Sequence, residues 1–294
     1  MATGFSFTPQ GPFDLSATCE YFGPWETSQD GALLAAFPVE GWEGSAAVCL
    51  RQASPTLLEG EVVAGGGQEE RAWRQLLATL SLDVDGSAFP DVGKRDPVIR
   101  RLQDGYRLLR PVCFYSPYEA AVGLILGQRS SIAQQRRVRT AMSEELGETI
   151  DIGGTRVSAF PPPAVLRSMS AFKGVPAEKI RRLHATADAA LAGVLDRRHL
   201  RSTPYAEALA QVREIHGVGE WTAQGIVLRG ANLADEVSDD HVTKRAVQVA
   251  YGLRASPSHE QVLEIAEQWR PYRMWAAVLL HVWLRREVGV RLPA

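Results

Sequence analysis

Apolar and polar residues follow different patterns in the two parts of the chain. Near the N-terminus, short β-type runs such as 41–50 (GWEGSAAVCL) and 57–64 (LLEGEVVA) are separated by turn residues, and a helical stretch over 69–80 follows them. Such runs, bounded by glycine, are typical of antiparallel strands. The pattern therefore predicts an antiparallel α+β domain over residues 1–92.

From about residue 96 the apolar positions recur with a helical period, and each segment opens with a capping signal. Ser116-Pro117-Tyr118-Glu119 has the spacing of a capping box, with proline at the first helical position. Comparable helix starts are Ser131, Pro161-Pro162-Pro163, Pro176, Thr203-Pro204, Ser258 and Pro271. Because the loops between these segments are short, we expect residues 93–294 to form a compact all-α region.

Composition excludes several classes of protein. Hydrophobic residues make up 45% of the 294 residues, but no 18-residue window is uninterruptedly apolar, so no membrane partner is expected. The first residues, MATGFSFTPQ, lack the features of a signal peptide, which predicts a cytoplasmic location. The three scattered cysteines do not suit a disulfide framework, a zinc site or a four-cysteine iron–sulfur cluster.

Charge is unevenly distributed along the chain. The formal net charge is −2, yet residues 1–93 hold 13 acidic and 3 basic side chains, and the remainder holds 21 acidic and 29 basic ones. This asymmetry is typical of a chain of which only one part meets a polyanion such as DNA. The alternative is that one domain merely happens to be acidic.

A tight turn interrupts the helical pattern at His216-Gly217-Val218-Gly219, within the segment 211–230 (QVREIHGVGEWTAQGIVLRG). Two glycines let the backbone turn sharply, and the amides of the turn and of the following helix can then hold a phosphate. An ordinary pair of antiparallel helices is the alternative interpretation.

About twenty residues later, Asp239 and Asp240 directly precede a helical pattern over 241–251. An aspartate at this place is an ideal helix N-cap, and capping alone would explain an isolated pair. A hairpin followed at this spacing by an aspartate that opens a helix is more specific than either feature alone.

With these two elements the chain resembles the 3-methyladenine DNA glycosylase II family of the helix-hairpin-helix DNA glycosylase superfamily. The resemblance extends from about Phe7 to Arg286, with the helix-hairpin-helix at about 205–230. It implies a small antiparallel β-domain followed by two helical subdomains. It also implies a monofunctional glycosylase that flips alkylated bases out of duplex DNA and hydrolyses their N-glycosidic bonds, which starts base excision repair. Asp240 would stabilise the oxocarbenium-like sugar, and alkylated pyrimidines remain open as a further substrate class.

The resemblance also assigns residues to a base pocket. Trp221, Trp283 and Tyr21 match lining positions, where stacking and cation–π attraction would favour an electron-poor base. For a tryptophan on a helical face, a place in the hydrophobic core is the alternative. His241 is assigned to the pocket as well, but His241 and Gly225 stand where the family pattern has aromatic residues. We therefore expect a more open or more polar pocket.

Two loops are expected to contact duplex DNA. One is the wedge loop Gln128-Arg129-Ser130, in which Arg129 would either fill the gap left by the flipped base or contact a phosphate. A solvated surface arginine is the alternative for this residue. The other is the hairpin, with the residues His216, Gly217, Val218, Gly219 and Thr222.

The resemblance further implies a monovalent cation, Na⁺ or K⁺, on the backbone carbonyls of Arg213, Ile215 and Val218. No cofactor is expected to be required, and a monomer suffices for this type of enzyme.

Two competing functions are weighed against this assignment. Superfamily members with lyase activity carry a lysine two residues beyond the second hairpin glycine, where this chain has Trp221. An indole cannot form a Schiff base, which argues against a glycosylase with lyase activity, and Lys244 on the next helix would be a poor substitute. The other alternative is a non-catalytic damaged-DNA-binding protein of the same fold, against which the presence of Asp240 argues.

Overall fold

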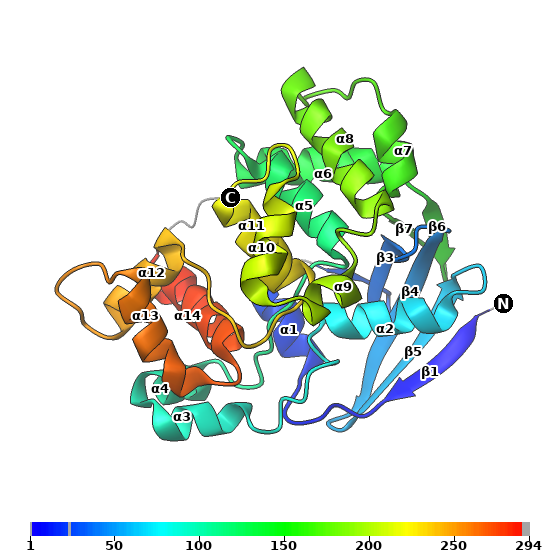
Figure 1. The fold of residues 1–294 in the computed structure, drawn as a ribbon. Helices are drawn as coiled ribbons and strands as arrows, with labels where there is room; N and C mark the ends of the chain where they lie inside the picture. The colour runs from blue at the N-terminus through cyan, green and yellow to red at the C-terminus, as the bar shows by residue number, and fades with distance from the viewer. Residues whose placement is uncertain (1, 23–24, 290–294) are drawn as a thin grey trace.

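A five-stranded antiparallel sheet forms one side of the molecule and helices form the rest (Figure 1). The computed structural model describes residues 2–22 and 25–289. The strand order is β1-β5-β4-β3-β2. The strands of this sheet are β1 (Thr3–Phe7), β2 (Glu26–Thr27), β3 (Leu33–Pro38), β4 (Ser45–Ser54) and β5 (Leu57–Ala64).

The helices of the first half are α1 (Leu15–Phe22), α2 (Glu69–Thr79), α3 (Val92–Arg95), α4 (Pro97–Gly105), α5 (Pro117–Gly127) and α6 (Ile132–Leu146). Those of the second half are α7 (Pro163–Ser168), α8 (Ala177–Leu191), α9 (Arg197–Ser202), α10 (Tyr205–Arg213), α11 (Glu220–Gly225), α12 (His241–Ala250), α13 (His259–Ala266) and α14 (Arg273–Glu287). A π-helical segment (Ile226–Gly230) continues α11, and short 3-10 turns lie at Phe89–Asp91 and Glu267–Trp269. Within the described residues no helix is long and apolar enough to cross a membrane.

The N-terminal part confirms the predicted antiparallel sheet. Helix α2 packs on β4 and β5, and its Trp73 stacks on Phe5 of β1 with ring centroids 5.4 Å apart. The expected run 41–50 begins as a strand only at Ser45, because Gly41 and Trp42 have positive φ angles and form a turn.

Capping side chains start the helices at the predicted places. The Ser116 hydroxyl accepts a hydrogen bond from the Glu119 amide (3.1 Å), and Ser131 and Ser258 cap α6 and α13 in the same way. The capping box expected at Ser116 is only half formed, because the buried Glu119 carboxylate forms an ion pair with Arg139.

The region expected to be all-α also contains a β-hairpin that the helical interpretation missed. Its strands are β6 (Thr149–Ile152) and β7 (Thr155–Ser158), joined by Gly153 and Gly154, both at positive φ. Ile152 and Val157 pack against Leu34 of β3. A two-glycine turn between alternating apolar residues was the sequence signal for this hairpin.

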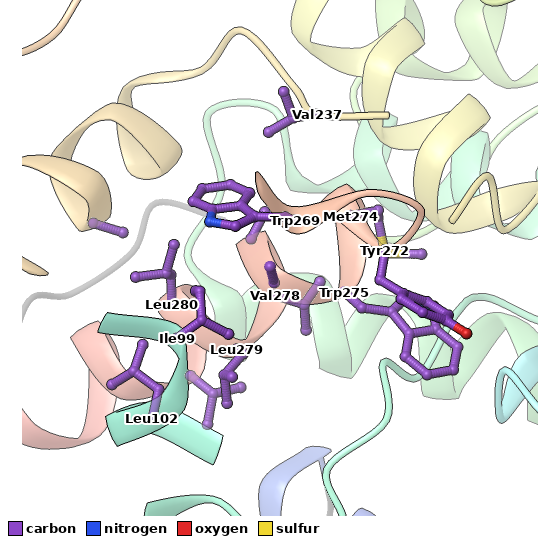
Figure 2. Packing of buried hydrophobic residues seen from close by; sticks show 14 of the residues in the cluster. Ile99, Leu102, Val237, Trp269, Tyr272, Met274, Trp275, Val278, Leu279 and Leu280 are labelled. Atoms are coloured by element: carbon purple, nitrogen blue, oxygen red, sulfur yellow. The ribbon is translucent and has the colours of Figure 1, made fainter. Parts of the chain in front are cut away.

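The helices enclose two separate hydrophobic cores. One is formed chiefly by α4, α12 and α14, and the other by α5, α8, α10 and α11. In Figure 2, Ile99 and Leu102 of α4 lie against Leu279 and Leu280 of α14. The same core includes Val237, so the segment before Asp240 is anchored to this core.

Candidate active site

The predicted hairpin is present, and its glycines have different constraints. Helix α10 ends at Arg213, and Gly217 in the turn adopts φ +90°, a conformation that favours glycine. A Cβ on Gly217 would lie 2.5 Å from Cδ of Arg182, whereas a Cβ on Gly219 would meet open space. The turn therefore needs glycine at Gly217 for its own folding, while Gly219 leaves room for an approaching partner.

Asp240 caps α12 and is saturated with hydrogen bonds. Its Oδ1 accepts from the amides of Val242 (2.7 Å) and Thr243 (2.9 Å). Its Oδ2 accepts from the hydroxyl of Thr243 (2.7 Å) and from that of Ser238. The capping interpretation and the catalytic one are thus compatible, because this N-cap also faces a hollow.

The surroundings of Asp240 favour its ionised form. Burial alone would raise its pKa, but His281 and the hydrogen bonds from Ser238 and Thr243 together hold the pKa below the usual value. Burial lowers the pKa of His281 to about 4, so this imidazole is neutral at pH 7. At that pH the hydrogen bonds stabilise the Asp240 carboxylate.

The hollow beside Asp240 has a volume of about 290 Å³ and lies between the two helical cores. This volume is at the lower end of the range for small-molecule sites. Trp221, 38% exposed, forms part of its wall, where the base pocket was expected. The other lining residues include Phe114, Leu124, Gln224, Gly225, Leu228, Arg229, Glu236, Met274, Val278 and His281.

Three residues assigned to the base pocket do not line this hollow. Trp283 follows His281 by two residues on α14, which turns it about 200° around the helix, and it packs against the α4–α14 core. The Arg286 guanidinium carbon lies 4.7 Å from the centroid of the Tyr21 ring, and Tyr21 makes an edge-to-face contact with Tyr106. His241 is exposed to solvent.

The surroundings of residues 225 and 241 bear on the expectation of a more open or more polar pocket, which stays a prediction. A Cβ on Gly225 would lie 2.8 Å from Cδ1 of Leu124, so the leucine of α5 already occupies that space. His241 is exposed and is not among the residues that line the hollow.

The wedge loop and the hairpin are joined by side-chain hydrogen bonds. Gln128 Nε2 donates to the Gly217 carbonyl (3.0 Å), and Arg182 of α8 donates to Gln128 Oε1 (2.6 Å). Lys179 of α8 donates to Ser130 Oγ (2.8 Å). Arg129, between them, is exposed and held at φ +54°. This loop therefore presents one cation from a fixed backbone.

Other residues of the two loops have different surroundings. His216 is exposed and contacts Glu178 of α8, with 3.1 Å between Nε2 and Oε1. The side chains of Val218 and Thr222 are buried, so any contact of these two residues with DNA would be through the backbone, as expected for the turn amides. Of the three arginines on α6, Arg136 and Arg137 are exposed, whereas Arg139 is paired with Glu119.

The expected cation site on the hairpin remains a prediction. The Ile215 carbonyl accepts a hydrogen bond from the Val218 amide (2.9 Å), which leaves its second lone pair free to coordinate a cation. An ion pair between Arg213 and Glu220 (2.9 Å) spans the two helices beside it. No group of three or more acidic, histidine or cysteine side chains suited to a metal occurs among the described residues.

Three polar partners of the site were not predicted. Ser238 and Thr243 flank Asp240 in the sequence, where hydroxyl residues two before and three after a capping aspartate were a usable signal. His281 lies 41 residues after Asp240, and only the packing of α14 against α12 brings the two together.

The sequence of this chain is similar to those of known DNA glycosylases. No family model matches the chain. A "DNA-3-methyladenine glycosylase" of Bacillus subtilis is 22% identical over 206 residues, 68% of each chain. "DNA-3-methyladenine glycosylase 2" of Escherichia coli is 30% identical over 173 residues, but that match spans only 56% of each chain.

Solved structures with the same fold cover nearly the whole chain. A 3-methyladenine DNA glycosylase from Archaeoglobus fulgidus superposes with a TM-score of 0.79 at 18% identity, over 97% of this chain and 100% of its own. An 8-oxoguanine glycosylase/lyase of Clostridium acetobutylicum, in complex with double-stranded DNA, gives 0.69 at 16% identity, over 99% of each chain. The chain thus has the fold of these DNA glycosylases, and its sequence is similar to proteins named DNA-3-methyladenine glycosylase.

Proposed function

We propose that the chain is a monofunctional DNA glycosylase that hydrolyses the N-glycosidic bond of alkylated bases in duplex DNA. The single observation that carries this proposal is an ionised, hydrogen-bonded carboxylate, Asp240, at the wall of a hollow that also holds the exposed indole of Trp221. The similarity of the chain to proteins named DNA-3-methyladenine glycosylase supports alkylated bases as the substrate class.

The carboxylate suits a reaction that develops positive charge on a sugar. Four donors fill the acceptor positions of Asp240, so it is a fixed negative charge and a poor proton acceptor. Such a charge stabilises an oxocarbenium-like transition state. An alkylated purine already carries positive charge and leaves without a strong general acid.

The base must first leave the helical stack, which costs a few kcal/mol. Trp221 offers a ring face to an electron-poor base in the hollow. The hairpin turn and the wedge loop would hold the strand beside it, with the exposed Arg129 filling the gap or contacting a phosphate.

Two observations support hydrolysis without lyase activity. Trp221 occupies the position of the lyase lysine, and it has no amine. The nearby amine, Lys244 Nζ, is held in an ion pair with Asp239 (2.5 Å) and does not line the hollow. The fold alone does not distinguish the two activities, because the Clostridium acetobutylicum relative is named a glycosylase/lyase.

The proposal is tested by incubating the protein with methylated duplex DNA and measuring free bases and strand breaks separately. We expect release of methylated bases, with strand breaks only after alkali treatment. Direct strand breaks would support a lyase. Binding without base release for any lesion would support a non-catalytic damaged-DNA-binding protein.

A further inference from the structure

A chain of polar side chains beside the hollow leads from Asp240 to helix α14. Thr243 Oγ1 lies 2.7 Å from Asp240 Oδ2 and 3.0 Å from His281 Nε2. Ser238 Oγ also contacts Asp240 Oδ2, and it lies 3.2 Å from Thr243 Oγ1. Thr243 is 1% exposed, so its hydroxyl must find partners within the protein.

The direction of these hydrogen bonds follows from the number of protons. An ionised carboxylate only accepts, so the single hydroxyl protons of Ser238 and Thr243 both point to Asp240 Oδ2. Thr243 Oγ1 has no second proton for the imidazole. The 3.0 Å contact is therefore a hydrogen bond only if His281 Nε2 carries a proton and donates it.

We propose that His281 is a positioning residue for the glycosylase reaction: its Nε2–H holds the Thr243 hydroxyl with the proton directed at Asp240. This inference rests on the proposed function for its catalytic consequence, but not for the hydrogen bond itself. His281 acts through Thr243, and it links α14 to the N-terminus of α12, where Asp240 is the N-cap.

A neutral imidazole suits this role better than a cation would. The charged or titratable groups around His281 are Asp240 on α12, Arg229 on the π-helical segment and Arg285 on α14, and Glu236 lines the same hollow. Burial keeps the pKa of His281 at about 4. A permanent positive charge here would offset the negative charge that the reaction needs, whereas a neutral Nε2–H orients the hydroxyl without cancelling that charge.

Three substitutions of His281 test the proposal, with single-turnover base release from methylated duplex DNA as the measurement. Glutamine places an amide N–H near the position of Nε2, asparagine places it near Nδ1, and leucine has no donor. We expect release to slow about tenfold in His281→Leu and His281→Asn, to stay within about twofold of wild type in His281→Gln, and DNA affinity to be unchanged in all three.

A second set of variants tests the path through Thr243. We expect Thr243→Val to slow release, and the double variant Thr243→Val/His281→Leu to be no slower than Thr243→Val alone, because His281 acts only through that hydroxyl. In His281→Leu the acid limb of the pH–rate profile should move toward neutral pH, because Asp240 loses part of its stabilisation. Additive effects, or equal losses in His281→Gln and His281→Leu, would overturn the proposal.

An independent measurement separates this inference from the proposed function. The ¹⁵N chemical shifts of the His281 ring in the free protein report its tautomer, and we expect a neutral ring protonated at Nε2. A ring protonated at Nδ1 would overturn the proposal whatever the enzyme's activity. If wild type releases no base but the tautomer is Nε2–H, the proposed function is wrong and the hydrogen-bond chain stands.

Discussion

The hollow beside Asp240 and the surface proposed to contact the DNA strand are built in opposite ways. This strand-contacting surface is formed by the wedge loop 128–130 and the hairpin turn 216–219. In the hollow a carboxylate 8% exposed has every acceptor position filled. On the surface, Arg129 and Gly217 hold positive φ angles, and Gln128 joins the two loops. The hollow depends on charge and its hydrogen bonds, whereas the surface depends on backbone shape.

This difference leads us to expect that variants separate chemistry from DNA binding. Changes in the hollow should lower the rate of base release and leave affinity intact. Changes on the strand-contacting surface should do the reverse.

The largest effect is expected for Asp240→Asn. Asparagine keeps the acceptor for the N-cap but removes the charge, so base release should fall by about a thousandfold or more. Because Nδ2 cannot accept from the Ser238 and Thr243 hydroxyls as Oδ2 does, the unfolding free energy should fall by about 1–3 kcal/mol. The variant should stay folded, and its DNA affinity should change little. The matched control is Asp239→Asn, which removes a partly exposed ion pair with Lys244 outside the hollow and should alter release by less than about twofold. Similar losses in both variants would contradict the assignment of Asp240.

Next in size is a pair of glycine substitutions on the strand-contacting surface. Gly217→Ala meets both a positive φ and the Arg182 side chain, so we expect a loss of about 1–3 kcal/mol in unfolding free energy and weaker DNA binding. Gly219→Ala has neither problem and should fold normally, yet its methyl group should block close approach of a phosphate and weaken DNA binding. Unchanged affinity in Gly219→Ala would mean that DNA does not approach the turn there.

A smaller effect is expected in the pH dependence of stability. Burial lowers the pKa of His281 from 6.5 to about 4, so between these values the unfolded chain binds a proton that the folded one does not. The unfolding free energy should therefore fall as the pH drops from 6.5 to 4, with this residue contributing up to about 1.4 kcal/mol per pH unit. Denaturant melts of wild type and His281→Gln should show a flatter curve for the variant in this window. Parallel curves would contradict the burial of a neutral imidazole.

The smallest effect is expected for Arg129→Ala. If the guanidinium fills the gap in the duplex, affinity should fall about fivefold, and the loss should persist at high salt because stacking is not screened. If it only contacts a phosphate, the slope of log affinity against log salt should drop by about one and the loss should vanish at high salt. Arg129→Lys keeps the charge and removes the planar group, so it distinguishes the two roles.

Local features of the fold and of the site were predictable. Proline and serine caps set the helix starts, the two glycines set the hairpin, and the place of Asp240 before α12 indicated an N-cap. Its assignment as the catalytic carboxylate came from the family resemblance and stays a prediction. The hairpin β6–β7 was missed although it too is local, because the all-α prediction for residues 93–294 was extended over it from the helical patterns on both sides.

The lining of the hollow was predicted less well. Trp221 is in the wall, but Trp283 and Tyr21 pack elsewhere, and Leu124 fills the space beside Gly225. The spacing of apolar residues along the sequence shows on which face of a helix a side chain lies. Which other helix that face contacts depends on how whole cores pack.

The sequence by itself determined where this chain turns, where its helices begin and which carboxylate opens α12, because each depends on residues a few positions apart. Only the tertiary structure decided that a threonine on α12 and a histidine on α14 jointly hold that carboxylate. These hydrogen bonds need donor and acceptor atoms about 3 Å apart on segments that are remote in the chain. Only the packing of α12 against α14 in the α4–α14 core sets those distances.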